Sequence, residues 1–247
     1  DIILAQYKSD ASRFKEIANR EVFLCGNLKF DQDIPNEINS IIDNIRSEWS
    51  VNGQRREVLI AASTHDPEEK IILDAFNEIK GQLNNPLLIL VPRHPERFEA
   101  VLELVLSNNL KVSLRSKKQD VSEGTDVLLG DTMGELSFLY SLSDVAFVGG
   151  SLIDHGGQNL LEPASLSLPI ISGPSLRNFQ EIALELESVG ALKIITSSQD
   201  LSSYFLDLIE NDDNRRISGE SANKVFIKNR GSLNLILEKL NPVLLGF

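Results

Sequence analysis

The stretch VAFVGGSLIDHGGQNLLEP, residues 145–163, decides the fold class. Its first four residues are apolar and predict a buried strand, a loop with four glycines in nine residues follows, and Asn159 stands where a helix should begin. Glycine lets a backbone approach another molecule closely, and a helix N-terminus offers N–H groups to a phosphate. Glu162 lies about one turn further on the same face, where a carboxylate suits sugar hydroxyls. An ordinary strand–loop–helix turn with glycine used for tightness would have the same sequence, and this stretch alone leaves both interpretations open.

Short apolar runs alternate with helix-like segments over most of the chain. We predict strands at residues 22–25, 58–61, 87–91, 111–115, 127–129, 145–148, 169–171 and 192–195. We predict helices at residues 9–19, 33–49, from Asp66 onward, 95–108, 134–141, 159–166 and 179–189, and mostly helices over 199–240. The strands are apolar throughout rather than alternately polar, which is typical of a parallel sheet covered on both faces. The sequence therefore predicts an α/β fold with a doubly wound parallel sheet.

The composition restricts the classes of function. The 247 residues carry a formal net charge of −12, which argues against a general nucleic-acid binder because a phosphate backbone requires a basic surface. The single cysteine, Cys25, cannot form an intrachain disulfide, and with only three separated histidines no structural zinc site is expected. No apolar run approaches the ~20 residues of a membrane span, and no signal peptide is visible. We expect neither a metal nor a cofactor.

Polar and glycine-containing segments follow four of the predicted strands. In a doubly wound fold, ligands bind outside the carboxyl ends of the strands, so these four loops are expected to meet at one edge of the sheet. An arginine in such a loop can bind phosphate or carboxylate through two hydrogen bonds, and an exposed methionine offers an apolar platform for a base. The candidate ligand-binding residues are Ser63, Pro92, Arg93, His94, Met133, Gly134, Glu135, Asn159, Leu160, Leu161 and Glu162.

Each of these residues also has a purely structural interpretation. Arg93 could form a surface salt bridge, and Glu135 could serve only the dipole of the helix it opens, with Asp131 as the helix cap. Ser63 and His65 could close the strand while Asp66 caps the next helix. The Asp154–His155 pair is interpreted as part of a flexible loop rather than as a catalytic pair, because no nucleophile motif surrounds it.

Several segments taken together resemble one family, the 3-deoxy-D-manno-octulosonic acid (Kdo) transferases. The resemblance covers nearly the whole chain, and its motifs are specific in combination rather than singly. It rests on AASTH (61–65), PRHPERF (92–98), GDTMGEL (130–136), residues 149–163, LAQ (4–6) and GNLKFD (26–31). That family has the GT-B fold, in which two Rossmann-like domains face each other across a cleft, and this chain is similar to its C-terminal half.

The resemblance implies a substrate and a set of contacts. The donor would be CMP-Kdo and the acceptor the lipid A precursor, in lipopolysaccharide biosynthesis. Nucleotide contacts would fall on Arg93 and His94, on Met133 to Glu135 and on Asn159 to Glu162. Cytosine would lie near Met133, the phosphate at the Asn159 helix start and the ribose hydroxyls on Glu162. Many family members have His and Pro where this chain has Gln158 and Leu160, so the resemblance does not extend a phosphate-binding role to position 158.

The resemblance also implies a division of the chain. Residues 1–30 would be the end of the N-terminal acceptor domain and the interdomain crossing, and residues 31–247 the CMP-Kdo binding domain. The chain begins without an initiator Met, and we expect a soluble fragment that binds CMP weakly and transfers nothing by itself. The catalytic Glu and the membrane-associated surface of the family belong to the N-terminal domain. The full-length protein would then act at the cytoplasmic face of the inner membrane of a Gram-negative bacterium.

Two other functions remain compatible with the sequence. One is another GT-B enzyme that uses a UDP-sugar, of the sugar-epimerase or N-acetylglucosaminyl transferase type. The other is a non-catalytic Rossmann-like module that binds a nucleotide. The first predicts preference for UDP over CMP, and the second predicts a gene without a cleft-forming partner domain.

Overall fold

The computed structural model describes residues 2–18, 20–31 and 39–245. The chain divides into two compact units, which we name the terminal unit (residues 1–35 with 224–247) and the sheet unit (residues 36–223). The helix start predicted at residues 33–36 lies outside the described residues.

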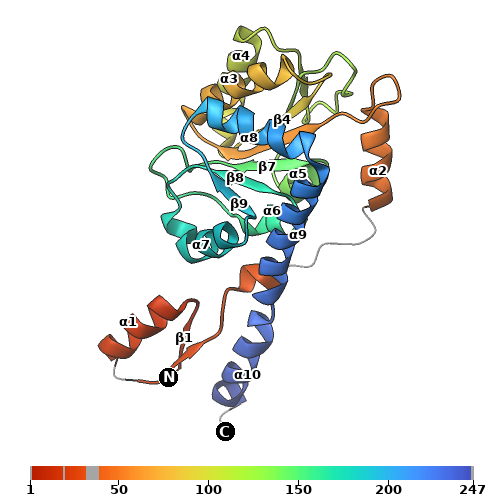
Figure 1. Ribbon diagram of the computed structural model, residues 1–247. Coiled ribbons are helices and arrows are strands. Elements are labelled where there is room, and N and C mark those ends of the chain that lie inside the picture. The colour runs from red at the N-terminus through yellow and green to blue at the C-terminus, as the bar shows by residue number, and fades with distance from the viewer. Residues whose placement is uncertain (1, 19, 32–38, 246–247) are drawn as a thin grey trace. The chain divides into compact units, whose positions relative to one another are not determined.

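The sheet unit contains seven parallel strands in the order β5-β6-β4-β3-β7-β8-β9 (Figure 1). They are β3 (Val58–Thr64), β4 (Leu87–Pro92), β5 (Val112–Leu114), β6 (Val127–Leu129), β7 (Val145–Val148), β8 (Ile170–Ser172) and β9 (Leu192–Ile194). Every pairing in this sheet is parallel, so the predicted doubly wound parallel sheet is confirmed.

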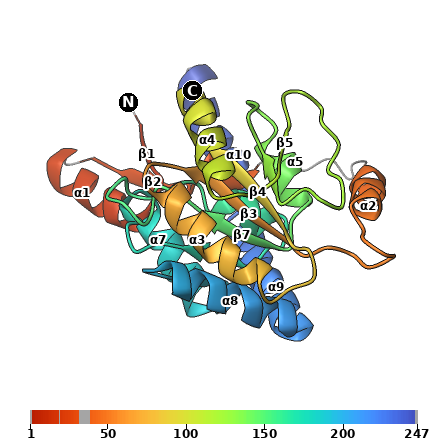
Figure 2. The same ribbon diagram turned by 90° about the horizontal axis from the view of Figure 1, so that it is seen from above.

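Helices cover both faces of this sheet (Figures 1 and 2). They are α2 (Asn39–Glu48), α3 (Glu68–Lys80), α4 (Phe98–Ser107), α5 (Leu136–Ser141), α6 (Leu161–Ser165), α7 (Gln180–Ser188), α8 (Ser198–Glu210) and α9 (Asp212–Lys228), the last of which crosses into the terminal unit. Short 3-10 helices precede α4 at Pro95–Arg97 and α7 at Arg177–Phe179.

Alternate residues of each central strand pack into two different hydrophobic cores, one on each face of the sheet. Leu59 and Ala61 of β3 pack with α3, α4 and α8, whereas Ile60 and Ala62 pack with α5 and with Trp49, which follows α2. Because both sets are apolar, each central strand has no polar face, as the continuous apolar runs predicted.

The direction in which strands are added reverses beside β3. From β3 the chain places β4, β5 and β6 on one side, then returns to place β7, β8 and β9 on the other. The reversal therefore falls between β3 and β7, and doubly wound folds bind their ligands at such a point.

Several helix starts differ from the sequence predictions. The helix α6 is shorter than predicted, beginning at Leu161 rather than Asn159. The cap predicted at Asp131 is wrong, because its carboxylate accepts the backbone N–H of Ser116 at 2.7 Å while α5 begins at Leu136. The cap predicted at Asp66 is also wrong, because the residue before α3 is Pro67 and no side chain caps that helix.

The terminal unit is small. It holds β1 (Ile3–Ala5), α1 (Lys8–Ala18), β2 (Val22–Leu24), a 3-10 helix at Leu28–Asp31 and α10 (Ser232–Leu245). The strands β1 and β2 pair in parallel, and the Asp31 carboxylate accepts the backbone N–H groups of Gly231 and Leu233, both at 2.6 Å. The helix predicted at 9–19 is confirmed, but its apolar face is not buried within this unit, since Ile17 is 82% exposed.

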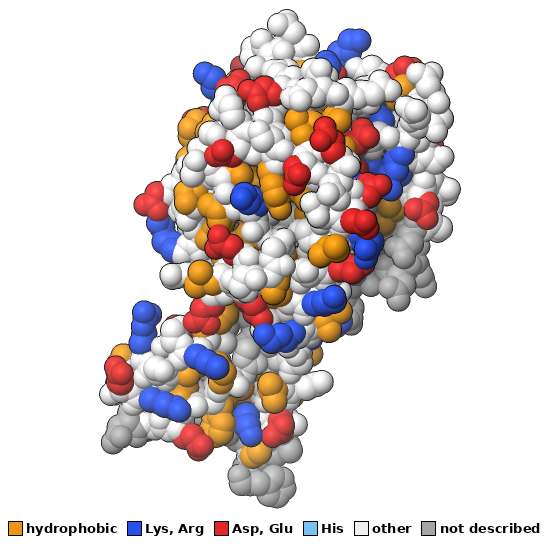
Figure 3. Space-filling view, in the orientation of Figure 1, with side chains coloured by type: hydrophobic (Ala, Val, Ile, Leu, Met, Phe, Trp, Pro, Cys, Tyr) orange, Lys and Arg blue, Asp and Glu red, His pale blue; other side chains and the backbone are white. Residues whose placement is uncertain are grey.

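Acidic and basic side chains are interspersed over the face of the sheet unit drawn in Figure 3, with apolar side chains between them. Among the described residues, no helix combines the length and the apolar character needed to cross a bilayer.

Candidate nucleotide site

The glycine loop after β7 is closed by a carboxylate from α3. Glu68 is fully buried and accepts the backbone N–H groups of Gly150 at 2.7 Å, Ser151 at 2.9 Å and Leu152 at 2.9 Å. It also accepts the N–H of His65 at 3.0 Å. The amides of Gly150–Leu152 are therefore used inside the protein and are not available to bind a phosphate.

The glycines of this loop pack against the chain itself. A Cβ at Gly149 would lie 2.7 Å from the carbonyl oxygen of Ser63 and 2.8 Å from Cα of Thr64. A Cβ at Gly157 would lie 2.6 Å from a methyl group of Leu176. The sequence did not single out Glu68, because a glutamate in the first turn of a helix is ordinarily explained by a favourable interaction with the helix dipole.

The turn after β3 is distorted at Ser63. Its φ is 55°, in the left-handed region, and the pairing of β3 with β4 shifts register between Ala62 and Thr64. Beyond the shift, the backbone N–H of Arg93 donates to the carbonyl oxygen of Thr64 at 2.9 Å. Irregular strand ends of this kind are enriched at functional sites because they redirect side chains.

Arg93 and His94 leave β4 at its carboxyl end. Pro92 is buried as the last residue of that strand, whereas the Arg93 and His94 side chains are exposed. Buried Pro92 fixes the direction of the chain, which presents both polar side chains at the rim of the sheet.

Asn159 organises the start of α6. Its amide oxygen accepts the N–H of Leu161 at 3.1 Å, and its amide nitrogen donates to a carboxylate oxygen of Glu162 at 2.9 Å. Leu160 and Leu161 are buried, so only their backbone can reach a ligand. The predicted pair is thus preassembled, with Asn159 holding the carboxylate of Glu162 in place.

The turn at Met133–Glu135 combines an exposed apolar side chain with an anchored carboxylate. Met133 is 64% exposed, and Gly134 has a φ of 82° with open space where a Cβ would stand. Glu135 accepts from Arg115 at 2.7 Å and from the hydroxyl of Thr132 at 2.6 Å. The hydrogen bond from Arg115 is the main reason that the pKa of Glu135 lies below its ordinary value.

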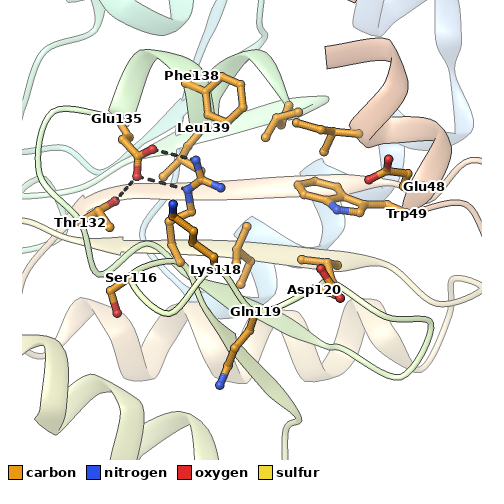
Figure 4. A pocket seen from close by; sticks show the side chains of 15 residues that line it. Glu48, Trp49, Ser116, Lys118, Gln119, Asp120, Thr132, Glu135, Phe138 and Leu139 are labelled. Carbon is orange, nitrogen blue, oxygen red and sulfur yellow. Dashed lines mark hydrogen bonds and ion pairs between the residues drawn. The ribbon is translucent and has the colours of Figure 1, made fainter. Parts of the chain in front are cut away.

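A cavity of about 670 Å³ adjoins this turn (Figure 4). Arg115 and Glu135 form one part of its wall, while Trp49 and Phe138 supply aromatic surface. Arg115 had no predicted role, because the sequence placed it only as the last residue of a strand. The position of Trp49 beside this cavity was not predicted either, because it results from contacts between segments far apart in the sequence.

The three histidines of the chain meet at the same rim. The ring centroid of His65 lies 4.5 Å from that of His155 and 5.3 Å from that of His94. His65 is only 8% exposed, and its pKa is lowered from the ordinary value first by burial and then by His155. The sequence treated these histidines as separate because they lie far apart along the chain. Within the described residues no group of three or more His, Cys, Asp or Glu side chains is placed to hold a metal ion.

The predicted site residues follow β6, β4, β3 and β7, which are four neighbouring strands. The structure therefore gathers all four loops along one edge of the sheet, and the direct link between the Arg93 N–H and Thr64 joins two of them. Nucleotide binding by these residues stays a prediction.

Comparison with known proteins identifies the family. Residues 45–225 match the family model for glycosyl transferases group 1. The chain is 37% identical over 246 residues to a 3-deoxy-D-manno-octulosonic acid transferase of Haemophilus influenzae, an alignment that covers 98% of this chain and 57% of that protein. The chain thus spans a little over half the length of this curated relative.

Solved structures extend the comparison. A crystal structure of the C-terminal CMP-Kdo binding domain of WaaA from Acinetobacter baumannii is 37% identical, with a TM-score of 0.70 over 75% of this chain and 96% of that one. Anabaena HepE in complex with UDP-glucose has a TM-score of 0.61 at 13% identity over 100% of this chain and 64% of that one, which shows the fold alone. The sheet unit has the Rossmann-like fold of a GT-B C-terminal domain, and the chain belongs to the group 1 glycosyltransferases, within the family of 3-deoxy-D-manno-octulosonic acid transferases.

Proposed function

We propose that this chain is the donor-binding half of an inverting glycosyltransferase that moves Kdo from CMP-Kdo to the lipid A precursor. The observation that carries the proposal is the Asn159–Glu162 pair, which stands at the carboxyl edge of the sheet in a chain 37% identical to a CMP-Kdo binding domain. A carboxylate already oriented by a neighbouring amide is suited to accept two ribose hydroxyls.

Residues of the other loops would contact the remaining parts of the nucleotide. Met133 and Gly134 would face cytosine, because the methionine offers an exposed apolar surface and the glycine leaves open space beside it. The phosphate would lie at the turn that opens α6, within reach of Arg93 and His94. Ser63 and Pro92 would shape the rim between these groups.

In the reaction, an acceptor hydroxyl oxygen attacks the anomeric carbon of Kdo while the bond from that carbon to the phosphate oxygen breaks. The electron pair leaves with CMP, and a carboxylate base that we place outside this chain takes the hydroxyl proton. This chain would hold the donor and stabilise the charge that develops on the leaving phosphate.

The proposal extends to the organisation of the full-length protein. Residues 1–30 would end the acceptor domain and cross to the donor domain of residues 31–247. The full-length enzyme would act at the cytoplasmic face of the inner membrane, where its lipid acceptor lies. Alone, this chain would bind CMP weakly and transfer no Kdo.

Thermal denaturation with CMP, CDP and UDP tests the proposal. Of the three nucleotides, CMP should raise the melting temperature most at equal concentration, because the proposed site fits it best. A ligand at 100 times its dissociation constant adds about 2.7 kcal/mol to the free energy of unfolding, which is a measurable shift. A larger effect of UDP than of CMP would favour an enzyme that uses a UDP-sugar. Transfer of Kdo by the purified chain would contradict the assignment of the base to another domain.

A further inference from the structure

The three histidines stand at the reversal point of the sheet. His65 follows β3, His94 follows β4 and His155 lies in the loop after β7, and these strands are neighbours in the order β4-β3-β7. The contact between His65 and His155, at 4.5 Å between centroids, joins the loops that follow β3 and β7, at the reversal point where doubly wound folds bind ligands.

The groups around these rings are mostly able to carry positive charge. Arg93 and His94 face His65 from the β4 loop, and both lower its pKa along with burial and His155. His94 has Glu96 3.9 Å from its Nδ1, and Gln158 lies 3.4 Å from Nε2 of His65. Asp154, next to His155, is paired with Arg177.

One buried carboxylate opposes these effects. The charge of Glu68 raises the pKa of His65, although burial and His155 outweigh it. Both oxygens of Glu68 accept backbone N–H groups, so it influences the imidazoles as a fixed negative charge rather than as a direct partner. Burial and the neighbouring His155 ring thus hold the pKa of His65 below its ordinary value, and an external anion beside the ring would oppose that effect.

We propose that His65, His94 and His155 form a proton-accepting seat for the phosphate of the donor nucleotide, so that binding of CMP takes up protons. An anion beside the rings adds to the negative charge of Glu68, which favours the imidazolium form. This inference rests on the proposed function and adds His65 and His155 to the residues expected to contact the donor.

The seat also bears on the reaction. The donor phosphate is a diester with one negative charge, whereas the CMP that leaves is a monoester with a second ionisation near pH 6 and thus close to two charges at neutral pH. Protonated imidazoles bind the more highly charged species better. They therefore stabilise the transition state, in which the electron pair is moving onto the phosphate oxygen.

Proton NMR of the three imidazoles tests the proposal directly, because a chain with three histidines gives few and separable ring signals. Titration of the purified chain with and without saturating CMP should show the pKa of His65 raised by CMP, and cytidine, which lacks the phosphate, should leave it unchanged. The ring signals of His94 and His155 should also shift in position when CMP binds. Unchanged imidazole pKa values in the presence of bound CMP would overturn the proposal.

Calorimetry supplies the second readout. At about pH 7.5, where a phosphate monoester is fully ionised, the binding enthalpy of CMP should differ between buffers of unlike ionisation enthalpy, since protons are taken from the buffer. His155→Gln, a change at an exposed position, should abolish much of this proton uptake and weaken CMP binding about tenfold, as expected for a hydrogen bond between charged groups.

Arg216→Gln is the matched control. It removes one positive charge from an exposed ion pair with Glu220 on α9 and should leave both readouts unchanged. If His155→Gln and the control bind CMP equally and with equal proton uptake, the seat does not exist although the nucleotide site does. If CMP fails to bind at any pH, the proposed function itself fails, and this inference fails with it.

Discussion

The carboxylate of Glu68 accepts the backbone N–H of Gly150 at 2.7 Å, which ties the first turn of α3 to the loop after β7. Two adjacent N–H groups and that of His65 bind the same carboxylate. The loop that bears His155 and leads to Asn159 is thereby fixed to the centre of the sheet from within. A rigid loop of this kind positions site residues without using the ligand to order them.

Glu68→Gln should lower the free energy of unfolding by about 2–4 kcal/mol, because it replaces charge-assisted hydrogen bonds and turns an amide NH₂ toward backbone donors. Urea denaturation measures the loss. Glu96→Gln, at an exposed carboxylate, is the control and should change stability little. Equal stability of the two variants would show that the buried carboxylate does not hold the loop.

Gly149→Ala should destabilise the protein because its Cβ would meet the Ser63 carbonyl oxygen at 2.7 Å. Gly81→Ala is matched to it, since the nearest atom there is at an ordinary 3.4 Å and Gly81 has a right-handed φ of −72°. Melting temperatures of the two variants should differ clearly, with Gly149→Ala the lower. A tolerated alanine at 149 would contradict the close packing of the loop on the β3–α3 turn.

Arg115→Ala should return the pKa of Glu135 upward toward its ordinary value, since the hydrogen bond from Arg115 is the main cause of its lowering. Both side chains are about one-third exposed, so the loss of stability should stay within about 1 kcal/mol. The released carboxylate should loosen the Met133 turn and weaken CMP binding, measured by calorimetry. CMP binding by Arg115→Ala as tight as by the wild type would show that this turn is not part of the nucleotide site.

Stability should depend on pH through His65. Its folded pKa lies below the ordinary 6.5, so in the window below 6.5 the unfolded chain binds more protons than the folded one. The free energy of unfolding should therefore fall as the pH is lowered through that window, and His65 should make no contribution above it. Urea denaturation at several pH values should show a shallower dependence for His65→Gln. A dependence as steep as in the wild type would contradict this assignment.

The sequence predicted the sheet and the loops of the site but not how the loops are held. Strands such as β3 and β4 can be predicted from their uninterrupted apolar runs, because a strand that is buried on both faces has no polar position. Helix starts were less predictable: Asp131 has the residue type of a cap but binds Ser116 instead. Glu68, Arg115 and the histidine cluster depend on pairings between residues distant in sequence, which local patterns do not contain.

The interaction of Glu162 with ribose tests the account most directly. Calorimetric titration of the wild type and of Glu162→Gln with CMP and with 2′-deoxy-CMP measures it. The wild type should prefer CMP about tenfold, the effect expected for one charge-assisted hydrogen bond, and Glu162→Gln should lose that preference while keeping its melting temperature. Equal binding of CMP and 2′-deoxy-CMP by the wild type, or an unchanged preference in Glu162→Gln, would contradict the assignment of the Asn159–Glu162 pair to the nucleotide.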